Sequence, residues 1–599
     1  MKSFFILLCI PFSVFSQNFT IEPYLQNATP NSIIIMWEYS NWDISYVEWG
    51  DTTTLENVDS TTFEITNSPS CLFTAHVNGL EPNTKYYYQV NTGNHKSSVY
   101  SFVTPNIALD EESINIIAMS DMQIDTDYPD KFAEINHGII NYFKQNYIGP
   151  VNQNLDLVLI PGDLVKTGTN YNHWKDHFFA QSKELFSEVP FYPVLGNHEE
   201  NSDFYFQYMH LPENGTKGYE EHWWYKDNSN VRIIGLNSNY EYQIQEQLDW
   251  LDSILNITIL DANIDFVFAQ LHHPHRSELW TPGNTNFTGD IIRILEKFTE
   301  ESGKPSIHFY GHTHGYSRGE SRDHEHLMVN VATAGGAIDY WDEWPQSDYE
   351  EYSISQDEWG YVLVEVNAGD NPMFRLKRVS MGNSQVPKYN NLEDSITIRL
   401  HNISPEKPIG IFPHFSDSVN VNNIIFRSSD FSDSDNDQHG GTQWQISNNC
   451  LDFTDPIIDK WVQHQNIYRN VKMDNSHSLT NQPFFGLQSN TDYCWRVRYR
   501  DKSLKWSDWS DPMQFRTDNT ELEIKVVPNP IYDKSIVTIP FINSSVIKIF
   551  DLDGRLIQEY NDLGKNIFSL DRSEFNSGVY ILKLFDQYSC IGVIKFTVL

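Results

Sequence analysis

The stretch that decides the fold is Ile307-His308-Phe309-Tyr310-Gly311-His312-Thr313-His314. It is a short, largely apolar run that ends in two histidines, the pattern of a buried strand that stops at a loop. Four other runs end in the same way, each in residue types that bind metals. These runs are 114–121, 155–163, 191–199 and 266–274, and the metal-ligand residue types at their ends are Asp121, Asp163, Asn197 with His198, and His272.

These strand ends can meet in space although they are far apart in the sequence. In layered α/β folds, polar groups gather in the crevice beyond the carboxyl ends of the strands. We therefore expect the five runs to converge on one pocket, and we place the chemistry of this protein between residues 121 and 314.

The length of 599 residues is too great for one core, because domains usually hold roughly 100–200 residues. We expect four folded pieces after a signal peptide over residues 1–16, where Met-Lys-Ser precedes the apolar run Phe4–Phe15. No later stretch approaches the ~20 apolar residues that a transmembrane helix needs. The sequence thus predicts a product that leaves the cytoplasm.

The charge is strongly acidic, with 41 basic and 80 acidic residues and a formal net charge of −39. This balance repels nucleic acids and anionic membranes, and we see no basic patch that would override it. Four cysteines remain after removal of the signal peptide, too few for a disulfide scaffold and without zinc-binding spacing. Only Cys450 and Cys494 are candidates for a pair.

Short strand patterns surround the central region on both sides. Residues 17–105 carry strand runs at Ser32–Trp37, Tyr46–Gly50 and Lys85–Val90, which indicate a small β-sandwich. The turn over residues 80–88, Leu-Glu-Pro-Asn-Thr-Lys-Tyr-Tyr-Tyr, resembles the corner of a fibronectin type III module. A similar corner at residues 487–498 predicts a second such sandwich over residues 395–518.

The central region, residues 113–385, alternates strand runs with helical patterns, as an α/β unit does. We expect helices at Lys131–Tyr147, Trp174–Phe186, Gln245–Leu255 and Asp290–Thr299.

The last segment, residues 522–599, is a compact β pattern with regular turns. Its runs 527–530, 549–555 and 578–582 resemble the C-terminal sorting domain of type IX secretion cargo. That resemblance implies the type IX machinery as a partner, passage of the outer membrane, and then release or attachment to the cell surface. The alternative is another small binding sandwich.

The residue types at the strand ends suit a pair of metal ions. Two Asp, one Asn and three His offer the oxygen and imidazole ligands that zinc, manganese or iron prefer. One carboxylate must bridge metals that lie roughly 3.5–4 Å apart, and a water shared between them becomes a hydroxide at neutral pH. Asp163 is the natural bridge.

The order Asp121-x-Gln123, Gly162-Asp163, Gly196-Asn-His-Glu, His272-x-Pro and Gly311-His-x-His resembles that of calcineurin-like metallophosphoesterases. The resemblance implies a multidomain protein in which a four-layer α/β sandwich is flanked by all-β immunoglobulin- or fibronectin-like sandwiches. A fibronectin-like module also precedes the catalytic domain in purple acid phosphatases.

The resemblance also implies roles for single residues. Asp121 and His314 would bind the first metal, and Asn197, His272 and His312 would bind the second, with Asp163 between them. His198 would contact the phosphate and protonate the departing oxygen.

Two positions depart from this family. Gln123 stands where most members have a second histidine, and we interpret it as a ligand or water anchor of the first metal, the alternative being a weakened site. Lys166 stands where purple acid phosphatases place a tyrosinate, so we do not expect a purple enzyme.

Other residues are candidates for contacts with a substrate. The loop 333–341 should return over the pocket and offer Tyr340 to an organic group. We expect His273 and His275 to be pocket residues and not ligands, and Asn197, His198, His273 and Tyr340 to contact the substrate.

The sequence thus predicts a secreted dinuclear-metal hydrolase in which a metal-bound hydroxide attacks the phosphorus of a small phosphomonoester. Two alternatives remain. One is a phosphodiesterase with the same constellation, and the other is a surface binding protein whose metal site has decayed at Gln123.

Overall fold

The computed structural model describes residues 18–107, 111–415, 417–421, 424–463, 478–484, 487–518, 524–539, 546–552, 554–560, 567–585 and 590–599. The predicted signal peptide, residues 1–16, lies outside the described residues. The chain divides into two compact units that meet in the sequence between His401 and Asn402. The predicted metal-binding residues all lie in the first unit.

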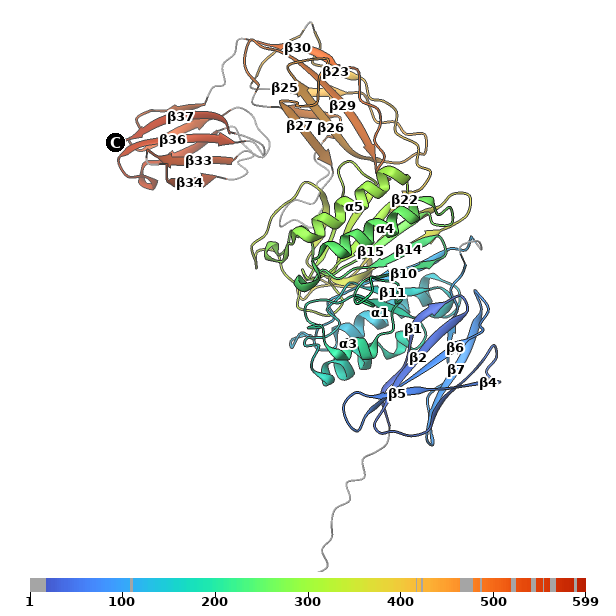
Figure 1. The fold of residues 1–599 in the computed structure, drawn as a ribbon. Helices are drawn as coiled ribbons and strands as arrows, with labels where there is room; N and C mark the ends of the chain where they lie inside the picture. Colours follow the sequence, from blue (N-terminus) through green and yellow to red (C-terminus); the bar gives the residue numbers. More distant parts are fainter. Residues whose placement is uncertain are drawn as a thin grey trace, which may run out of the picture. The chain divides into compact units, whose positions relative to one another are not determined.

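The first unit begins with a β-sandwich of two sheets (Figure 1). Trp37, Val47, Phe73 and Tyr88 are fully buried in its core. One sheet has the order β1-β2-β6-β5, with bounds Phe19–Thr29, Ser32–Tyr39, Cys71–Asn78 and Thr62–Ile65. The other has the order β4-β3-β7-β8, with β9 also on β7, and bounds Asn57–Ser60, Ser45–Gly50, Lys85–Thr92, His95–Lys96 and Tyr100–Val103.

Two larger sheets follow and form the centre of the unit. The six-stranded sheet has the order β12-β11-β10-β20-β21-β22, with bounds Phe191–Pro193, Leu157–Ile160, Ile114–Ala118, Trp359–Asn367, Met373–Gly382 and Pro387–Arg399. The seven-stranded sheet has the order β13-β14-β15-β16-β18-β17-β19, with bounds Trp224–Asn228, Val231–Gly235, Phe266–Gln270, Ser306–Tyr310, His326–Val331, Tyr316–Glu320 and Tyr352–Gln356.

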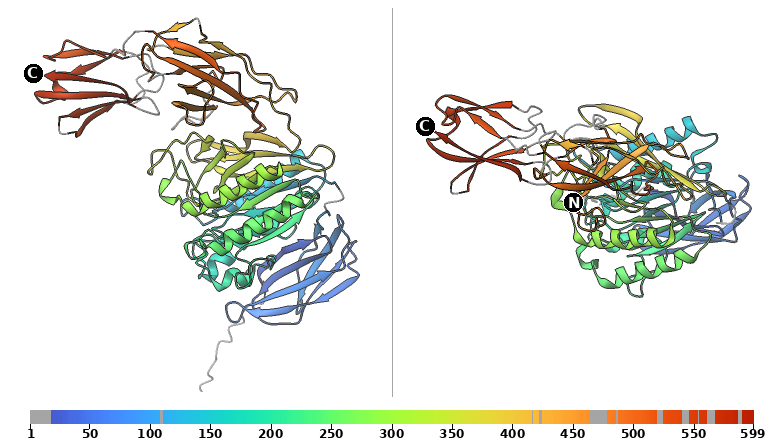
Figure 2. Two further views of the ribbon diagram at one scale, coloured as in Figure 1. Left: turned by 45° about the horizontal axis from the view of Figure 1, so that its top comes forward. Right: turned by 90° about the horizontal axis from the view of Figure 1, so that it is seen from above.

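The two sheets pack face to face, and helices cover them, which gives the predicted four layers (Figures 1 and 2). The Phe374 ring of β21 lies 5.2 Å, centroid to centroid, from both Phe266 and Phe268 of β15. The helices are α1 (Lys131–Asn146), a π-helical turn (His173–Phe179) that leads into α2 (Ala180–Phe186), α3 (Asp203–Tyr208), α4 (Gln245–Leu260) and α5 (Asn286–Ser302). All four predicted helices are therefore confirmed.

Helix α5 shows how local sequence fixes these elements. The Thr285 side chain accepts a hydrogen bond from the backbone N–H of Phe287, and Gly303 ends the helix at a φ of 69°. Phe287, Ile291 and Leu295 recur at helical spacing and are buried with α4 against β15. This packing holds the strand whose end carries His272.

The five predicted strand runs are β10, β11, β12, β15 and β16. The first three are parallel neighbours in one sheet, and the last two are parallel neighbours in the other. Their carboxyl ends therefore meet at one edge of the two packed sheets, as the sequence pattern predicts. The sheet itself runs on to Arg399 through β22, beyond the predicted domain end at residue 385, because β22 pairs with β21 along its length.

The N-terminal sandwich is joined to the α/β part through a buried carboxylate. Glu38 of β2 is fully buried and accepts hydrogen bonds from the hydroxyls of Tyr171 and Tyr208, which belong to the α/β part. Thr20 and Thr66 of the sandwich donate the other two bonds, each at 2.7 Å. Four donors satisfy a charge that would otherwise be costly to bury.

The second unit contains two β regions. The first has a three-stranded sheet, β23-β25-β28, and a five-stranded sheet, β24-β30-β29-β26-β27. Their bounds are Gly410–Phe412, Ile424–Ser428, Asn481–Phe484, Ser418–Val419, Met513–Thr517, Asp492–Asp501, His439–Ser447 and Ile458–Gln463. Cys450 and Cys494 form a disulfide in this region, so the predicted pair is confirmed.

The C-terminal region is the compact β domain that the sequence predicts. It has the sheets β31-β32-β35 and β34-β33-β36-β37. The bounds are Lys525–Val527, Lys534–Thr538, Ile567–Asp571, Leu556–Tyr560, Val546–Asp551, Gly578–Phe585 and Cys590–Val598. Across the described residues, no helix has the length and apolarity needed to cross a membrane.

The Glu38 contact can be tested with a matched pair of tyrosines. Tyr208→Phe removes a 2.8 Å bond to the carboxylate and should lower the stability of the first unit by about 1.5–3 kcal/mol. Tyr205→Phe removes a 3.2 Å bond to the neutral Pro193 carbonyl and should cost only about 0.5–1.5 kcal/mol. Differential scanning calorimetry measures both, and equal losses would contradict the role given to Glu38.

Candidate metal centre

The structure brings the predicted ligand positions together at the shared edge of the two sheets. Among the described residues, two groups of side chains have ligand atoms within 4.8 Å of one another. One group is Asp121, Asp163 and His272, and the other is His272, His273 and His312. Both lie at the strand ends that the sequence singles out.

His272 lies at the centre of one half of the site. Its Nε2 is 3.0 Å from Asn197 Oδ1, 3.2 Å from His312 Nδ1 and 3.3 Å from Asp163 Oδ2. Its Nδ1 faces the Pro161 carbonyl oxygen at 2.9 Å and must donate its hydrogen there. In the neutral imidazole, Nε2 is therefore an acceptor that faces two further acceptors, the oxygens of Asn197 and Asp163.

Such a cluster of acceptors requires a cation. Burial lowers the pKa of His272, but the nearby Asp163 carboxylate outweighs it and raises the pKa to about 9. The raised pKa of His272 shows that the surrounding groups favour a positive charge at this position. Imidazole nitrogens with amide and carboxylate oxygens are ligands that zinc, manganese and iron accept, so these residues fit a metal ion.

Asp121 and His314 form the other half. Asp121 Oδ1 lies 3.2 Å from His314 Nε2, and His314 Nδ1 donates to the Ala337 carbonyl. Gln123 Nε2 is 3.0 Å from Asp163 Oδ2 and 3.4 Å from His314 Nε2. The amide oxygen of Gln123 is buried and has no hydrogen-bond partner among the described residues. The Gln123 amide thus lies among the groups of this half and retains an unused acceptor.

Asp163 lies between the two halves. Its Oδ2 faces Gln123 on one side and His272 on the other, while its Oδ1 accepts the His198 backbone N–H at 3.0 Å. Nearby histidines, His272 first among them, outweigh burial and lower the pKa of Asp163 below its usual value. A charged oxygen that faces both halves has the position that a bridging ligand needs.

Glu199 supports this arrangement, and our sequence analysis gave it no role. It is fully buried and accepts the backbone N–H groups of Asp163, Leu164 and Gly196 at 2.9, 2.8 and 2.7 Å. Burial and the Asp163 carboxylate raise the pKa of Glu199, while the N–H donors favour its charged form. Its place in the Gly-Asn-His-Glu run was the available signal, but its partners are backbone groups that a sequence does not show.

The ligand loops are held in an unusual backbone conformation. Asp121, Asp163 and His312 have φ values of 61°, 56° and 71°, in the left-handed region that non-glycine residues rarely adopt. Glycines precede two of them, and a Cβ on Gly311 would overlap with the Asp121 carboxylate. The Gly-Asp and Gly-His motifs are therefore steric requirements of this site.

His198 reaches the edge of the site from the exposed side. Its Nδ1 is 2.7 Å from the Lys166 carbonyl, which fixes the hydrogen on that nitrogen. Its Nε2 is 3.9 Å from Asp163 Oδ2, and the side chain is 36% exposed. A free Nε2 at the solvent side of the site can give or take a proton.

His273 lies beside the ligand positions, and its Nδ1 is occupied by a hydrogen bond. The Ser238 hydroxyl oxygen accepts the backbone N–H groups of His272 and His273, so it donates to His273 Nδ1 at 2.9 Å. The neutral ring then carries its hydrogen on Nε2. Burial lowers the pKa of His273 to about 3, which keeps it neutral. The ring is 4.4 Å from that of His312, centroid to centroid.

Tyr340 lies on the loop after the last histidines. Its hydroxyl is 2.9 Å from that of Ser384, and the neighbouring Asp339 accepts the backbone N–H of His314 at 2.8 Å. Gly336 donates to the Asp121 carbonyl at 2.8 Å, so the loop is fastened to the metal centre. The structure thus places the loop where the sequence analysis expects it, and a substrate contact by Tyr340 stays a prediction.

Comparison with known families gives each part of the chain a class. Residues 114–316 match the calcineurin-like phosphoesterase family, and residues 20–104 match the purple acid phosphatase N-terminal domain. Residues 456–520 match the Rha78A-like N-terminal immunoglobulin domain, and residues 525–595 match the secretion system C-terminal sorting domain. The chain therefore carries a calcineurin-like phosphoesterase domain and is a metal-dependent phosphoester hydrolase.

Comparison with solved structures gives one match that supports the fold and a weaker one. The purple acid phosphatase PPD1 from yellow lupin (Lupinus luteus) seeds matches with a TM-score of 0.50 at 16% identity, over 63% of this chain and 74% of that one. The structure of PhoD matches with a TM-score of 0.48 at 12% identity, over 65% of this chain and 92% of that one. Comparison with curated proteins returned no match.

The role of Glu199 can be tested by a charge-neutral substitution. Glu199→Gln places an N–H group opposite the backbone donors, so we expect metal affinity to fall by about 10–100-fold. The exposed neighbour Glu200, which accepts the Thr169 hydroxyl at 2.9 Å, supplies the control Glu200→Gln. Metal titration followed by calorimetry measures both variants, and wild-type affinity in Glu199→Gln would show that Glu199 does not support the site.

Proposed function

We propose that this protein is a secreted phosphatase that hydrolyses a small phosphomonoester at a two-metal centre. The observation that carries the proposal is the convergence of two oxygens, Asn197 Oδ1 and Asp163 Oδ2, and the His312 Nδ1 atom on His272 Nε2. Asn197, His272 and His312 would hold one metal, and Asp121, His314 and Gln123 the other. Asp163 would bridge them.

Bound metals would supply Lewis-acid charge for the phosphoryl oxygens and would lower the pKa of the attacking water. The imidazole, amide and carboxylate groups suit iron, zinc or manganese. Gln123 can serve this half of the site in two ways, because its amide offers an oxygen to a metal and an N–H to Asp163. In both cases the Gln123 amide stays next to the Asp163 carboxylate.

His198 would complete the reaction as an acid. The Lys166 carbonyl holds the ring through Nδ1, so Nε2 can carry the proton that the leaving oxygen takes up. In its charged form the ring would also stabilise the phosphoryl oxygens. Asn197, His198, His273 and Tyr340 are the residues that we propose to contact the substrate.

The proposed domains follow the predicted boundaries, with the α/β part extended through β22. The C-terminal sorting domain points to secretion and attachment at the cell surface. We propose that a signal peptide over residues 1–16 starts this route and that the type IX machinery completes it.

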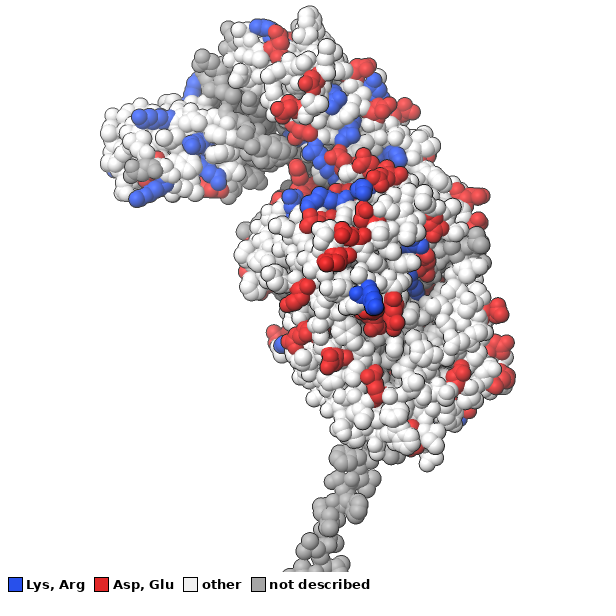
Figure 3. All heavy atoms as spheres, viewed as in Figure 1, with Lys and Arg blue, Asp and Glu red and all other residues white. Residues whose placement is uncertain are grey.

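Acidic side chains are spread over the face of the first unit seen in Figure 3, with Lys and Arg among them.

Replacement of His198 separates catalysis from metal binding. His198→Ala should lower kcat by about 10²–10⁴-fold, because the acid that protonates the leaving oxygen is lost. Both metals should stay bound, because the His198 ring is not one of the proposed metal ligands. His137→Ala, at an exposed histidine that pairs with Glu184 at 3.4 Å, is the control. Unchanged turnover in His198→Ala with full metal content would remove this role from His198.

The substrate class is tested by two model esters on one sample. We expect metal-reconstituted protein to cleave p-nitrophenyl phosphate faster than bis-p-nitrophenyl phosphate, with about two metals bound per chain. Asp163→Asn should lose both metals and all turnover. Faster diester cleavage would replace the phosphatase by a phosphodiesterase, and a protein that binds no iron, zinc or manganese would instead be a binding protein.

A further inference from the structure

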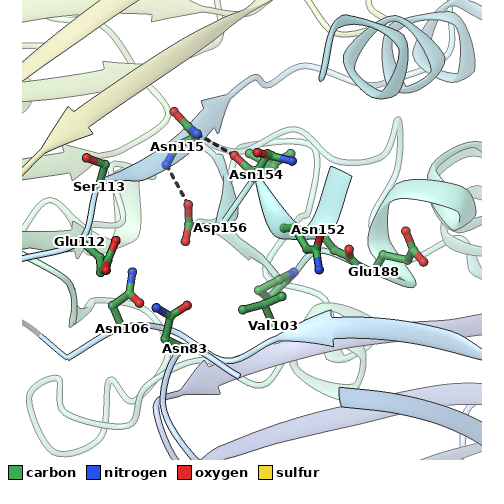
Figure 4. A pocket seen from close by; sticks show the side chains of 13 residues that line it. Asn83, Val103, Asn106, Glu112, Ser113, Asn115, Asn152, Asn154, Asp156 and Glu188 are labelled. Atoms are coloured by element: carbon green, nitrogen blue, oxygen red, sulfur yellow. Dashed lines mark hydrogen bonds between the residues drawn. The ribbon is translucent and has the colours of Figure 1, made fainter. Parts of the chain in front are cut away.

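A polar cavity lies in the first unit where the N-terminal sandwich meets the six-stranded sheet (Figure 4). Its volume is about 230 Å³, and its lining includes Asn83 and Val103 from the sandwich and Asn115 and Asp156 from the α/β part. Asn106 comes from the segment that joins the two. The cavity is therefore built across the joint between two domains, away from the strand ends that carry the metal centre.

Two buried amides in this cavity have acceptors without donors. Asn106 is only 7% exposed, and its Oδ1 has no hydrogen-bond partner among the described residues. Asn152 is 3% exposed and likewise has an unpartnered Oδ1, while its Nδ2 donates to the Ser101 carbonyl and hydroxyl at 2.6 and 2.8 Å. Buried polar atoms are normally satisfied, so these two oxygens point to a missing partner.

A carboxylate completes the set of acceptors. Asp156 Oδ2 accepts the backbone N–H of Asn115 at 2.8 Å, which fixes the side chain toward the cavity. Glu112 and Asn106 point toward the same space in Figure 4. Burial raises the pKa of Asp156 to about 6, although backbone N–H donors and the buried Lys226 favour the charged form.

The described residues that line the cavity include no positive group, and the cation that acts on Asp156 is the buried Lys226 behind the lining. Among the lining residues are three carboxylates, Glu112, Asp156 and Glu188, and no Lys, Arg, His or Cys. Amide and carboxylate oxygens without nitrogen or sulfur ligands are the chemistry of a hard cation. A bulk water occupies roughly 30 Å³, so the cavity has room for an ion that keeps several waters.

We propose that this cavity binds a calcium ion through Asp156 and Asn106, with waters as the remaining ligands. Calcium accepts such irregular sets of oxygen ligands, whereas magnesium demands a small octahedral site. A site with few charged ligands should bind with a dissociation constant of about 10⁻⁴–10⁻³ M, as extracellular calcium modules do. The ion would fasten the sandwich to the α/β part at the segment that joins them.

The experiment measures calcium binding where the metal centre cannot contribute. In the full chain with Asp163→Asn, which disables that centre, radioactive calcium should bind at one site per chain. In the wild-type chain with its centre loaded, calcium at about ten times the dissociation constant should raise the Tm of the first unit by roughly 2 °C. The cavity proposal does not depend on the proposed phosphatase activity, because neither measurement uses turnover.

Three substitutions locate the site. Asp156→Asn keeps an acceptor for the Asn115 N–H but removes the charge, and we expect at least a tenfold loss of calcium affinity. Asn106→Leu should have a similar effect through the loss of an amide oxygen. Asp51→Asn removes a charge from an exposed turn of the sandwich and should leave calcium binding unchanged.

Each result of these measurements either supports or overturns the calcium site. Loss of binding in Asp156→Asn, with wild-type turnover on p-nitrophenyl phosphate as the sign of a folded chain, would support the site. An absence of both calcium binding and a shift in Tm would show a cavity filled by water and overturn the proposal. Equal shifts with magnesium would overturn the assignment to calcium, and undiminished binding in Asp156→Asn and Asn106→Leu would place the ion elsewhere.

Discussion

The metal centre depends on hydrogen bonds that fix which nitrogen of each imidazole carries its hydrogen. His272, His198 and His314 each direct Nδ1 at a backbone carbonyl, of Pro161, Lys166 and Ala337. Their Nε2 atoms are therefore left as acceptors that point toward Asp163 or Asp121. Because the carbonyls belong to the loops that follow the strands, the same loops position the rings and determine their chemistry.

This arrangement strains the backbone at three of the proposed ligands. Asp121, Asp163 and His312 lie in the left-handed region, and the surrounding structure has to maintain them there. Glu199 does so for Asp163, because it accepts the backbone N–H groups of Asp163 and of Gly196 in the next ligand loop. The strain is thus held by a buried carboxylate that touches no metal-binding side chain through its own bonds.

Much of this was predictable, for a physical reason. A buried strand that ends in Asp or His shows in the sequence both its apolar run and its terminal residue, so β10, β11, β15 and β16 could be assigned together with the side chains after them. The Cys450–Cys494 pair was predictable because few other cysteines compete for either partner. The helices followed from their apolar periodicity.

Other features depend on contacts that leave no recognisable pattern in the sequence. Glu199 bonds to backbone groups, which every residue has, so its role is not visible in its motif. The strand β22 reads as an exposed, polar segment, and only its pairing with β21 places it in the sheet. The cavity beside Asp156 is lined by asparagines, which are common in loops and carry no pattern.

The Glu38 contact makes the α/β part dependent on the N-terminal sandwich. A carboxylate of the sandwich receives the hydroxyls of Tyr171 and Tyr208, and Tyr24 of the sandwich donates in turn to the Tyr208 carbonyl. A shortened chain that starts at the α/β part would expose these tyrosines and leave their hydroxyls without their acceptor. The sandwich therefore shares a buried polar contact with the α/β part, and a fragment designed to keep that contact has to run from β1 through β22.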